Sequence, residues 1–450
     1  MTAGSPTVAV TPGETRRVAA AGGIGTVLEW YDYGLYGTAS ALVITPLFFA
    51  DLGEFAGQLA SFATFAVGFV ARPIGGIALG ILGDRIGRKK TLLTTIWIMG
   101  LTTFLVGCLP TSNTIGIVAP ILLVLLRLIQ GFGAGAELAG ALTYVSESTA
   151  SGRRGFYTSF SSAASVMGTF VSTGVFAIVV ALTTQDQLLA WGWRIPFLVS
   201  AIILIVAFVI RTRLEDSPEF QKLQELAAAN PESMKARTRV PLWDMLRNDT
   251  RSFFSGLLAP TGLSVVAYVT SVFGVTYIVG TLKMPASMSL VVILSATAAG
   301  VICTPFFGIL ADRIGAKKVF IFGAVFGAVF AFPFFLMLGT RQVWVIILAV
   351  CLNYGIAWGA TAGSQGLFLP ALFRTRYRFT GVATSRELNS AIFAGPAPLI
   401  AAALVGAAGG RPWLVAWMLI IAMAITILGV VLGTVRREDD VATVIESDAA

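Results

Sequence analysis

The chain alternates long apolar runs with short polar connections along nearly its whole length. Each run is close to, or longer than, the roughly 20 residues that a helix needs to cross a bilayer. Twelve such runs lie near residues 19–49, 57–82, 91–109, 115–145, 155–182, 191–210, 253–280, 287–310, 319–338, 343–369, 381–408 and 413–435. The pattern therefore predicts an all-α polytopic membrane protein with 12 transmembrane helices.

The longest polar interruption, residues 211–251, divides the runs into two groups of six. It predicts a partly helical cytoplasmic linker between an N-terminal six-helix bundle, residues 19–210, and a C-terminal six-helix bundle, residues 252–435. Residues 1–18 and 436–450 are predicted to be cytoplasmic tails. The first run is too long for a secretory signal and contains two carboxylates, which favours an uncleaved first span.

Positive charge is distributed unevenly between the two sides of the predicted bundle. Most of the 31 Lys and Arg residues fall in the tails and in connections on the same side as the tails, whereas the opposite loops hold only Lys283, Arg341 and Arg411. Basic connections resist translocation, so both termini and the linker are predicted to be cytoplasmic. The expected location is the cell (plasma) membrane, the inner membrane of a bacterial cell.

Composition supports a membrane location and excludes several functions. The chain is 56% hydrophobic and only 12% charged, too apolar for a soluble fold of this length. The net charge of +8 sits in short connections rather than on one soluble face, which argues against a nucleic-acid partner. The sequence has no histidine, and its three cysteines have no metal-ligand spacing, so we expect no metal, no cofactor and no enzyme activity.

An eleven-residue segment occurs twice. Residues 80–90 read GILGDRIGRKK and residues 308–318 read GILADRIGAKK, so nine of eleven positions are identical. Each copy is a short basic turn between two apolar runs, which indicates two homologous halves. Within each copy an Asp–Arg pair can interact across a helix end, and the glycines let backbones approach.

This segment resembles the signature loop between helices 2 and 3 of the major facilitator superfamily, with its echo between helices 8 and 9. The resemblance implies the fold of that family, with two pseudo-symmetric six-helix halves. It also implies a cytoplasmic charge lattice that locks one conformation, to which a similar Glu and Arg-Arg-Gly pattern between helices 4 and 5 would contribute. Solvated charges of a positive-inside loop are the alternative. The predicted cytoplasmic gate consists of Gly83, Asp84, Arg85, Gly87, Arg88, Glu147, Arg154, Asp312 and Arg313.

Two carboxylates lie within the first predicted span. Glu29 and Asp32 are three residues apart and share a helix face with Tyr33 and Tyr36. Ionised groups inside lipid are costly and usually functional. Because two nearby carboxylates disfavour joint ionisation, one of them can take up and release a proton. The alternative is a packing salt bridge to Arg72 or Arg127.

The fourth span supplies a buried cation. Arg127 is followed on the same face by Gln130, and the glycines after it permit close helix contact. Those glycines are no dinucleotide motif, because no strand precedes them. Glu137 lies on the same stripe, nearer the cytoplasm, and is assigned to the proton pathway or the inner gate. The predicted proton-coupling residues are Asp32, Glu29, Arg127 and Glu137.

The second half carries its own intramembrane charges, Arg386 and Glu387, on span 11. Neighbouring helix residues point about 100° apart, which predicts that these two address different partners rather than each other. Arg386 is a candidate anion anchor and, alternatively, a partner for the cytoplasmic interface. The predicted substrate-binding residues are Arg127, Gln130, Tyr33, Tyr36, Arg72, Arg386 and Asn389.

Several local strings narrow the family. EWYDYGLY at residues 29–36, ARPIGG at 71–76, RLIQG at 127–131 and WGWRIPF at 191–197 together resemble the metabolite:proton symporters. That resemblance implies a substrate such as shikimate, 2-oxoglutarate or citrate, or else proline or betaine. The short tail without heptads disfavours the osmosensing betaine/proline branch. One departure is Gly135-Ala136-Glu137 in place of the usual Gly-Gly-Glu, which leaves the role of Glu137 open.

These features predict a proton-coupled symporter that imports a small organic carboxylate, such as shikimate or a dicarboxylate or oxoacid, by alternating access. The predicted proton carrier is Asp32, coupled to Glu29, with Arg127 as counter-ion. Its partners are substrate, proton and lipid, and we expect it to function as a monomer. A zwitterion symporter of the proline/betaine type and a non-transporting sensor with a carrier fold remain alternatives. The sequence has no phosphate-binding loop, which argues against an ATP-driven pump. Charges distributed over separate helices argue against a symmetric pore.

Overall fold

The computed structural model describes residues 26–27, 29–86, 88–135, 145–146, 149, 152–212, 245–247, 249–374 and 378–435. For residues 80–81, 83–86, 88–90, 92, 207 and 210–212 it describes the backbone alone. Predicted gate residues Gly83, Asp84, Arg85 and Arg88 therefore have no described side-chain surroundings, and Gly87, Glu137 and Glu147 lie outside the described residues. Most of the predicted linker and both predicted tails also lie outside them.

The first half of the bundle comprises the described helices up to residue 212. Its first span is helical over residues 29–39 and continues through η1 (Ser40–Ile44) and α2 (Thr45–Phe48). The longer helices that follow are α3 (Gly53–Ile86), α4 (Arg88–Cys108), α6 (Val118–Gly133), α8 (Arg154–Leu182) and α10 (Arg194–Thr212). Short elements between them are η2 (Ala50–Leu52), α5 (Ser112–Ile115), α9 (Gln185–Gln187) and η3 (Leu188–Gly192).

The second half runs from residue 250 to residue 432. Its first span consists of α14 (Thr250–Leu258), α15 (Thr261–Tyr268), η4 (Val269–Phe273), α16 (Gly274–Thr276) and η5 (Tyr277–Thr281). Continuous helices α17 (Ala286–Ile314) and α18 (Ala316–Gly339) come next. The next span consists of α19 (Val343–Leu352), η6 (Asn353–Trp358) and α20 (Gly359–Phe368), and is followed by the short turn η7 (Pro370–Leu372). The span after it consists of α21 (Arg378–Asn389), η9 (Ser390–Ala394) and α22 (Ala397–Ala407). The last span is α23 (Trp413–Leu432).

Membrane-length helices dominate the described residues. Eight are long and apolar enough to cross a bilayer, and a pair bent by 45°, Gln185–Gly192 with Arg194–Val206, adds a ninth. Shorter apolar helices cover Leu93–Cys108 and Val118–Gly133, and residues 29–48 complete the series. Each predicted span thus has a helical counterpart, although the fourth helix begins at Val118 rather than near residue 115, since residues 112–115 form a separate short turn.

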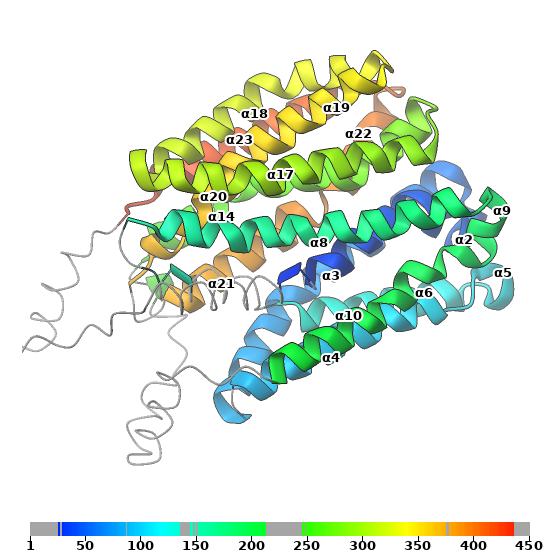
Figure 1. The fold of residues 1–450 in the computed structure, drawn as a ribbon, viewed down its shortest axis with the longest axis horizontal. Helices are drawn as coiled ribbons and strands as arrows, with labels where there is room; N and C mark the ends of the chain where they lie inside the picture. Colours follow the sequence, from blue (N-terminus) through cyan, green and yellow to red (C-terminus); the bar gives the residue numbers. More distant parts are fainter. Residues whose placement is uncertain are drawn as a thin grey trace, which may run out of the picture.

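The two halves pack side by side with their helices roughly aligned (Figure 1). The most extensive contact between them joins α8 to α17, which run next to each other across the middle of the molecule. On the opposite side of the bundle, α3 packs against α21, η9 and α22. The two halves therefore meet along two seams, one formed by α8 and α17 and the other by α3 with α21, η9 and α22.

Among the described residues, five helical passes contain π-helical turns, a conformation that is rare and often found at functional sites. In the second half these turns are η4 and η5 in the pass that begins with α14, η6 after α19, and η9 after α21. In the first half they are η1 and η3. Two of them, η6 and η9, carry residues that line the central cavity described below. Each inserts an extra residue into the helix and so turns the following side chains toward a different direction.

Glycines set the close crossing of α3 and α6. A Cβ atom added at Gly131 would lie 1.9 Å from the carbonyl oxygen of Gly68, and one at Gly75 would lie 1.9 Å from that of Phe132. Such distances are possible only without side chains, as expected for small residues at membrane helix interfaces. This crossing also brings Gly68 against Arg127, whose Nη2 would be 3.0 Å from an added Cβ.

Gly131→Ala is therefore expected to destabilise the first half, because the new methyl group must push two backbones apart. Overpacking of this kind typically costs about 1–3 kcal/mol, which should appear as a lower unfolding midpoint temperature in detergent. Gly339→Ala is the matched control, since it is also helical and has nothing within 4 Å of the added Cβ. Equal stability of the two variants would contradict the inferred close crossing.

Candidate functional site

A small cavity lies between the halves near the middle of the bundle. Its volume is about 40 Å³, room for only one or two water molecules. Ligand pockets typically measure roughly 300 Å³ or more, so the walls must separate before an organic metabolite can enter. The lining residues are Trp30, Ser165, Val166, Thr169, Leu263, Ser264, Ala267, Tyr268, Tyr354, Trp358, Gln365, Arg386, Ser390 and Ala394.

Aromatic rings form much of the cavity wall. The Trp30 and Tyr268 rings stack with centroids 6.3 Å apart, and the Tyr354 and Trp358 rings stack at 5.0 Å. Trp30 comes from the first half and the other three from the second. Stacked faces of this kind can hold an apolar ring or attract a cationic headgroup.

Polar groups of the lining have unused hydrogen-bonding capacity. Within the described part of the chain, Arg386 Nε, Gln365 Oε1 and the Tyr268 hydroxyl are buried without a hydrogen-bond partner. The Gln365 amide is fixed in orientation because its Nε2 donates a hydrogen bond to the Ser162 hydroxyl of the other half, at 3.0 Å. Buried polar atoms are normally satisfied, so unsatisfied donors and an acceptor around one cavity are suited to a polar ligand.

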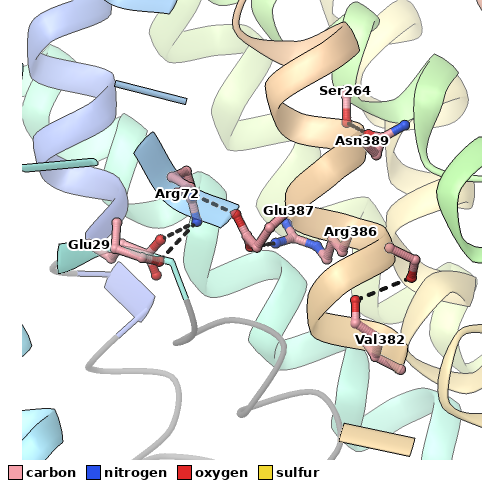
Figure 2. Close-up of polar contacts among 9 residues, drawn as sticks. Glu29, Arg72, Ser264, Val382, Arg386, Glu387 and Asn389 are labelled. Carbon is pink, nitrogen blue, oxygen red and sulfur yellow. Dashed lines mark hydrogen bonds and ion pairs between the residues drawn. The ribbon is translucent and has the colours of Figure 1, made fainter. Parts of the chain in front are cut away.

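A chain of charges connects the cavity to the seam between α3 and α21 (Figure 2). Arg72 Nη2 lies 2.7 Å from Glu29 Oε1, and Arg72 Nε lies 2.7 Å from Glu387 Oε2. Glu387 Oε1 lies 3.4 Å from Nη1 of Arg386, which lines the cavity. All four side chains are buried, and the Arg72–Glu387 pair joins residues of opposite halves. We call these residues the charge chain.

The prediction that Arg386 and Glu387 address separate partners was wrong in part. Glu387 does reach across to Arg72, but its second oxygen also faces Arg386. The arginine side chain is long enough to bend back toward the neighbouring residue on the helix. The Glu387 carboxylate therefore pairs with two cations, one through each oxygen.

Asp32 belongs to a second polar cluster, next to the charge chain, and the Tyr33 ring lies between the guanidinium groups of the two. Its two oxygens accept hydrogen bonds from the Thr103 hydroxyl and from Gln130 Nε2. Arg127 Nη1 donates to Gln130 Oε1, so the glutamine amide stands between the carboxylate and the guanidinium. Helices α4 and α6 thus supply the partners of a carboxylate on the first span. We call Asp32, Thr103, Gln130 and Arg127 the Asp32 cluster.

Arg127 is held mainly by aromatic faces. Its guanidinium carbon lies 3.9 Å from the ring centroid of Tyr36 and 5.4 Å from that of Tyr33. Arg127 is fully buried, and its Nε and Nη2 have no hydrogen-bond partner within the described residues. Burying a cation this way is costly, and the ring quadrupoles offset part of that cost.

The structure places the sequence-predicted site residues in different environments. Of the seven predicted substrate-binding residues, all of them described, only Arg386 lines the cavity. Asn389 is held by the Leu257 carbonyl and the hydroxyls of Thr261 and Ser264. Arg72 serves the charge chain, while Arg127, Gln130, Tyr33 and Tyr36 surround the Asp32 cluster.

Several cavity residues were missed by sequence reasoning. Trp30 lies inside one of the quoted family strings, and Tyr268, Tyr354, Trp358 and Gln365 are distributed over two apolar runs. Aromatic residues in a membrane span are as suited to packing as to binding, so only Gln365 carried a usable signal, as an uncharged polar group within a span. Among the described residues no group of three metal-ligating side chains is found.

One predicted gate residue connects the halves at the end of the α8–α17 seam where α8 begins. Both oxygens of Asp312 accept backbone hydrogen bonds, from Gly155 at 2.7 Å and from Phe156 at 2.9 Å. The acceptor thereby caps the N-terminus of α8, where negative charge is favourable. A Cβ added at Gly155 would lie 2.6 Å from the Gly308 carbonyl oxygen, so the backbones touch here. Of the other two described gate side chains, Arg154 Nε donates to the Thr149 carbonyl and Arg313 is exposed.

Comparison with known proteins gives consistent matches over most of the chain. The family model of the Major Facilitator Superfamily matches residues 23–396. The shikimate transporter of Escherichia coli is 36% identical, with 87% of this chain and 88% of that protein covered. The proline/betaine transporter of Salmonella typhimurium is 30% identical, with coverage of 97% and 86%. A crystal structure of a D-xylose-proton symporter superposes with a TM-score of 0.70 at 18% identity, over 94% of this chain and 98% of that one.

Proposed function

The chain belongs to the major facilitator superfamily, and we propose that it is a proton-coupled symporter that imports a small organic carboxylate by alternating access. The predicted family and the predicted fold of two six-helix halves are confirmed by these matches. The chain is accordingly a transporter and no enzyme, as its named relatives are transporters. The inferred substrate is shikimate or a dicarboxylate or oxoacid of similar size.

One observation carries the substrate class: the Arg386 guanidinium borders a cavity between the halves and keeps a buried Nε donor unused. Guanidinium donors form strong, charge-assisted hydrogen bonds with carboxylates. Gln365 Oε1 would accept a hydrogen bond from a substrate hydroxyl, and the stacked rings would hold a carbocycle. The relative named as a shikimate transporter agrees with this chemistry.

A second candidate is a zwitterion of the proline or betaine type. The aromatic rings that favour it are those of Trp30, Tyr268, Tyr354 and Trp358, since a quaternary ammonium binds to ring faces. Arg386 would still bind the carboxylate. A relative named as a proline/betaine transporter supports this alternative.

Proton coupling is assigned to the Asp32 cluster, with Asp32 as carrier and Arg127 acting through Gln130. Glu29, which the sequence grouped with Asp32, pairs instead with Arg72. We assign the cytoplasmic gate to the repeated loop segments, where Asp312 caps α8. The protein would act as a monomer in the cell membrane with both termini cytoplasmic, driven by the proton gradient without a cofactor, and Glu137 would belong to the same proton pathway.

The test is uptake into proteoliposomes of labelled shikimate, 2-oxoglutarate, citrate, glycine betaine and proline, with and without a pH gradient. We expect accumulation of one carboxylate only when the lumen is more alkaline than the medium. Accumulation of glycine betaine or proline alone would select the second candidate. Failure of every solute to move, or indifference to the gradient, would overturn the proposal, and binding without proton flux would indicate a sensor.

A further inference from the structure

We propose that the charge chain, defined above as Glu29, Arg72, Glu387 and Arg386, is a second proton site, where binding of an anionic substrate at Arg386 makes Glu387 take up a proton. This inference rests on the proposed function in one respect, the binding of a substrate carboxylate by Arg386. The substrate-linked proton is assigned to Glu387 on α21 and leaves with the substrate, whereas return of the empty carrier still requires Asp32 to release the transport proton.

The argument begins with charge balance. The charge chain contains two carboxylates and two guanidinium groups, all buried, so it is neutral as it stands. A substrate carboxylate at Arg386 adds one negative charge to a region with little water to screen it. An uncompensated buried charge is so costly that a titratable group normally neutralises it by changing its protonation. A proton from the aqueous phase forming an O–H bond on one carboxylate restores neutrality.

Geometry selects Glu387 over Glu29 as the acceptor. Glu29 keeps Arg72 at 2.7 Å whatever happens in the cavity. Glu387 shares Arg72 with Glu29, and its contact with Arg386 is the longest in the charge chain, at 3.4 Å. When Arg386 turns toward the substrate, Glu387 alone loses a cation.

Among the described side chains, few other titratable groups face Glu387. From the first span come Glu29 and the Tyr33 ring, which lies 4.9 Å from the guanidinium carbon of Arg72. From α15 comes Tyr268, a cavity residue. Helix α14 also packs on α21, but its Arg251 is exposed and donates to the Leu432 carbonyl. Phenols remain neutral at physiological pH. Among the described residues, the substrate's negative charge must therefore be compensated within the charge chain.

Protonation of Glu387 would act directly on the seam between the halves. The Arg72–Glu387 pair joins α3 to α21, and a neutral carboxyl no longer attracts Arg72 as an ion. Substrate and proton together would therefore weaken a contact that neither weakens alone. Each promotes binding of the other, as reciprocal linkage requires.

The first experiment needs no substrate. Arg386→Gln removes one positive charge and so imitates the charge imbalance that an anionic substrate creates. Infrared spectra of the purified variant at neutral pH should show the C=O band of a protonated carboxyl group that is weaker in the wild type, in Arg386→Lys and in the double variant Arg386→Gln/Glu387→Gln. Absence of the band from Arg386→Gln, or its persistence in the double variant, would overturn the proposal.

The second experiment uses shikimate, an anion at neutral pH, and glycine betaine, which carries no net charge. Calorimetry in buffers of different ionisation enthalpy measures the protons taken up on binding. We expect uptake of about one proton with shikimate, none with glycine betaine, and none with shikimate in Glu387→Gln. Asp32→Asn should still take up about one proton when shikimate binds. If proton uptake disappears in Asp32→Asn but persists in Glu387→Gln, the assignment to Glu387 is wrong.

The two experiments separate failure of the inference from failure of the proposed function. If neither compound binds but the infrared band behaves as expected, the proposed substrate class is wrong and the proton site stands. If shikimate binds and is transported but the band never appears, the proposed function stands and Glu387 is not the acceptor.

Discussion

Replacing Asp32 by Asn is expected to abolish accumulation of substrate against its gradient while sparing exchange of substrate across the membrane. The amide has nearly the same shape but cannot take up or release a proton. It can also satisfy the partners of the carboxylate, since Gln130 Nε2 can donate to the amide oxygen and the amide nitrogen can donate to the Thr103 hydroxyl. The fold should survive, and uptake with an imposed pH gradient should fall to the level seen without one.

Counterflow in proteoliposomes measures the exchange that remains, because it requires reorientation of the loaded carrier but no net proton movement. Asp186→Asn, on the exposed short helix α9, is the control and should accumulate substrate like the wild type. If Asp32→Asn accumulates substrate undiminished, Asp32 is not the proton carrier.

The helices could be predicted because lipid leaves the chain little choice. A spanning segment must satisfy its backbone internally and match the thickness of the bilayer, so length and apolarity suffice to find it. The repeated loop segment at residues 80–90 and 308–318 exposed the duplication for a similar reason, since basic turns stand out between apolar runs. The same segment indicated the superfamily, and four local strings then indicated the metabolite:proton symporters within it.

The pairing of the intramembrane charges could not be predicted in the same way. Sequence placed Glu29 and Asp32 on one helix face and suggested that they act together, yet each has separate partners in the structure. The Arg72–Glu387 contact joins residues 315 positions apart, and no local rule relates them. Which arginine meets which carboxylate depends on how α3 and α21 cross, a property of the packed bundle.

The cavity was hidden for a different reason. Its Tyr354 and Trp358 belong to the π-helical segment η6, where the extra residue changes the direction of the following side chains. Helical periodicity read from the sequence assumes an unbroken α-helix and so assigns such positions to the wrong face. Asn389 is the converse case, because a polar residue within a span was assigned to substrate and its amide donates hydrogen bonds to Leu257 and Thr261 of a neighbouring pass.

Replacing Arg72 by Gln is expected to destabilise the protein more than any other single change in the charge chain. It would leave Glu29 and Glu387 buried without the cation that lies 2.7 Å from each. Removing one partner of a buried ion pair costs about 3–5 kcal/mol, because the remaining charge is desolvated and unpaired. The unfolding midpoint temperature should fall clearly below that of Arg411→Gln, an exposed loop control.

The double variant Glu29→Gln/Arg72→Gln separates the charge from the packing. It keeps the charge chain neutral, because Glu387 still pairs with Arg386. Neutral side chains of similar shape can replace a buried ionic pair with little loss, so the double variant should regain most of the stability lost by Arg72→Gln. It should still fail to transport, because the contact between α3 and α21 could no longer respond to substrate or proton. A double variant as unstable as Arg72→Gln would mean that the arginine acts through its packing against Tyr33 and Phe69 rather than through its charge.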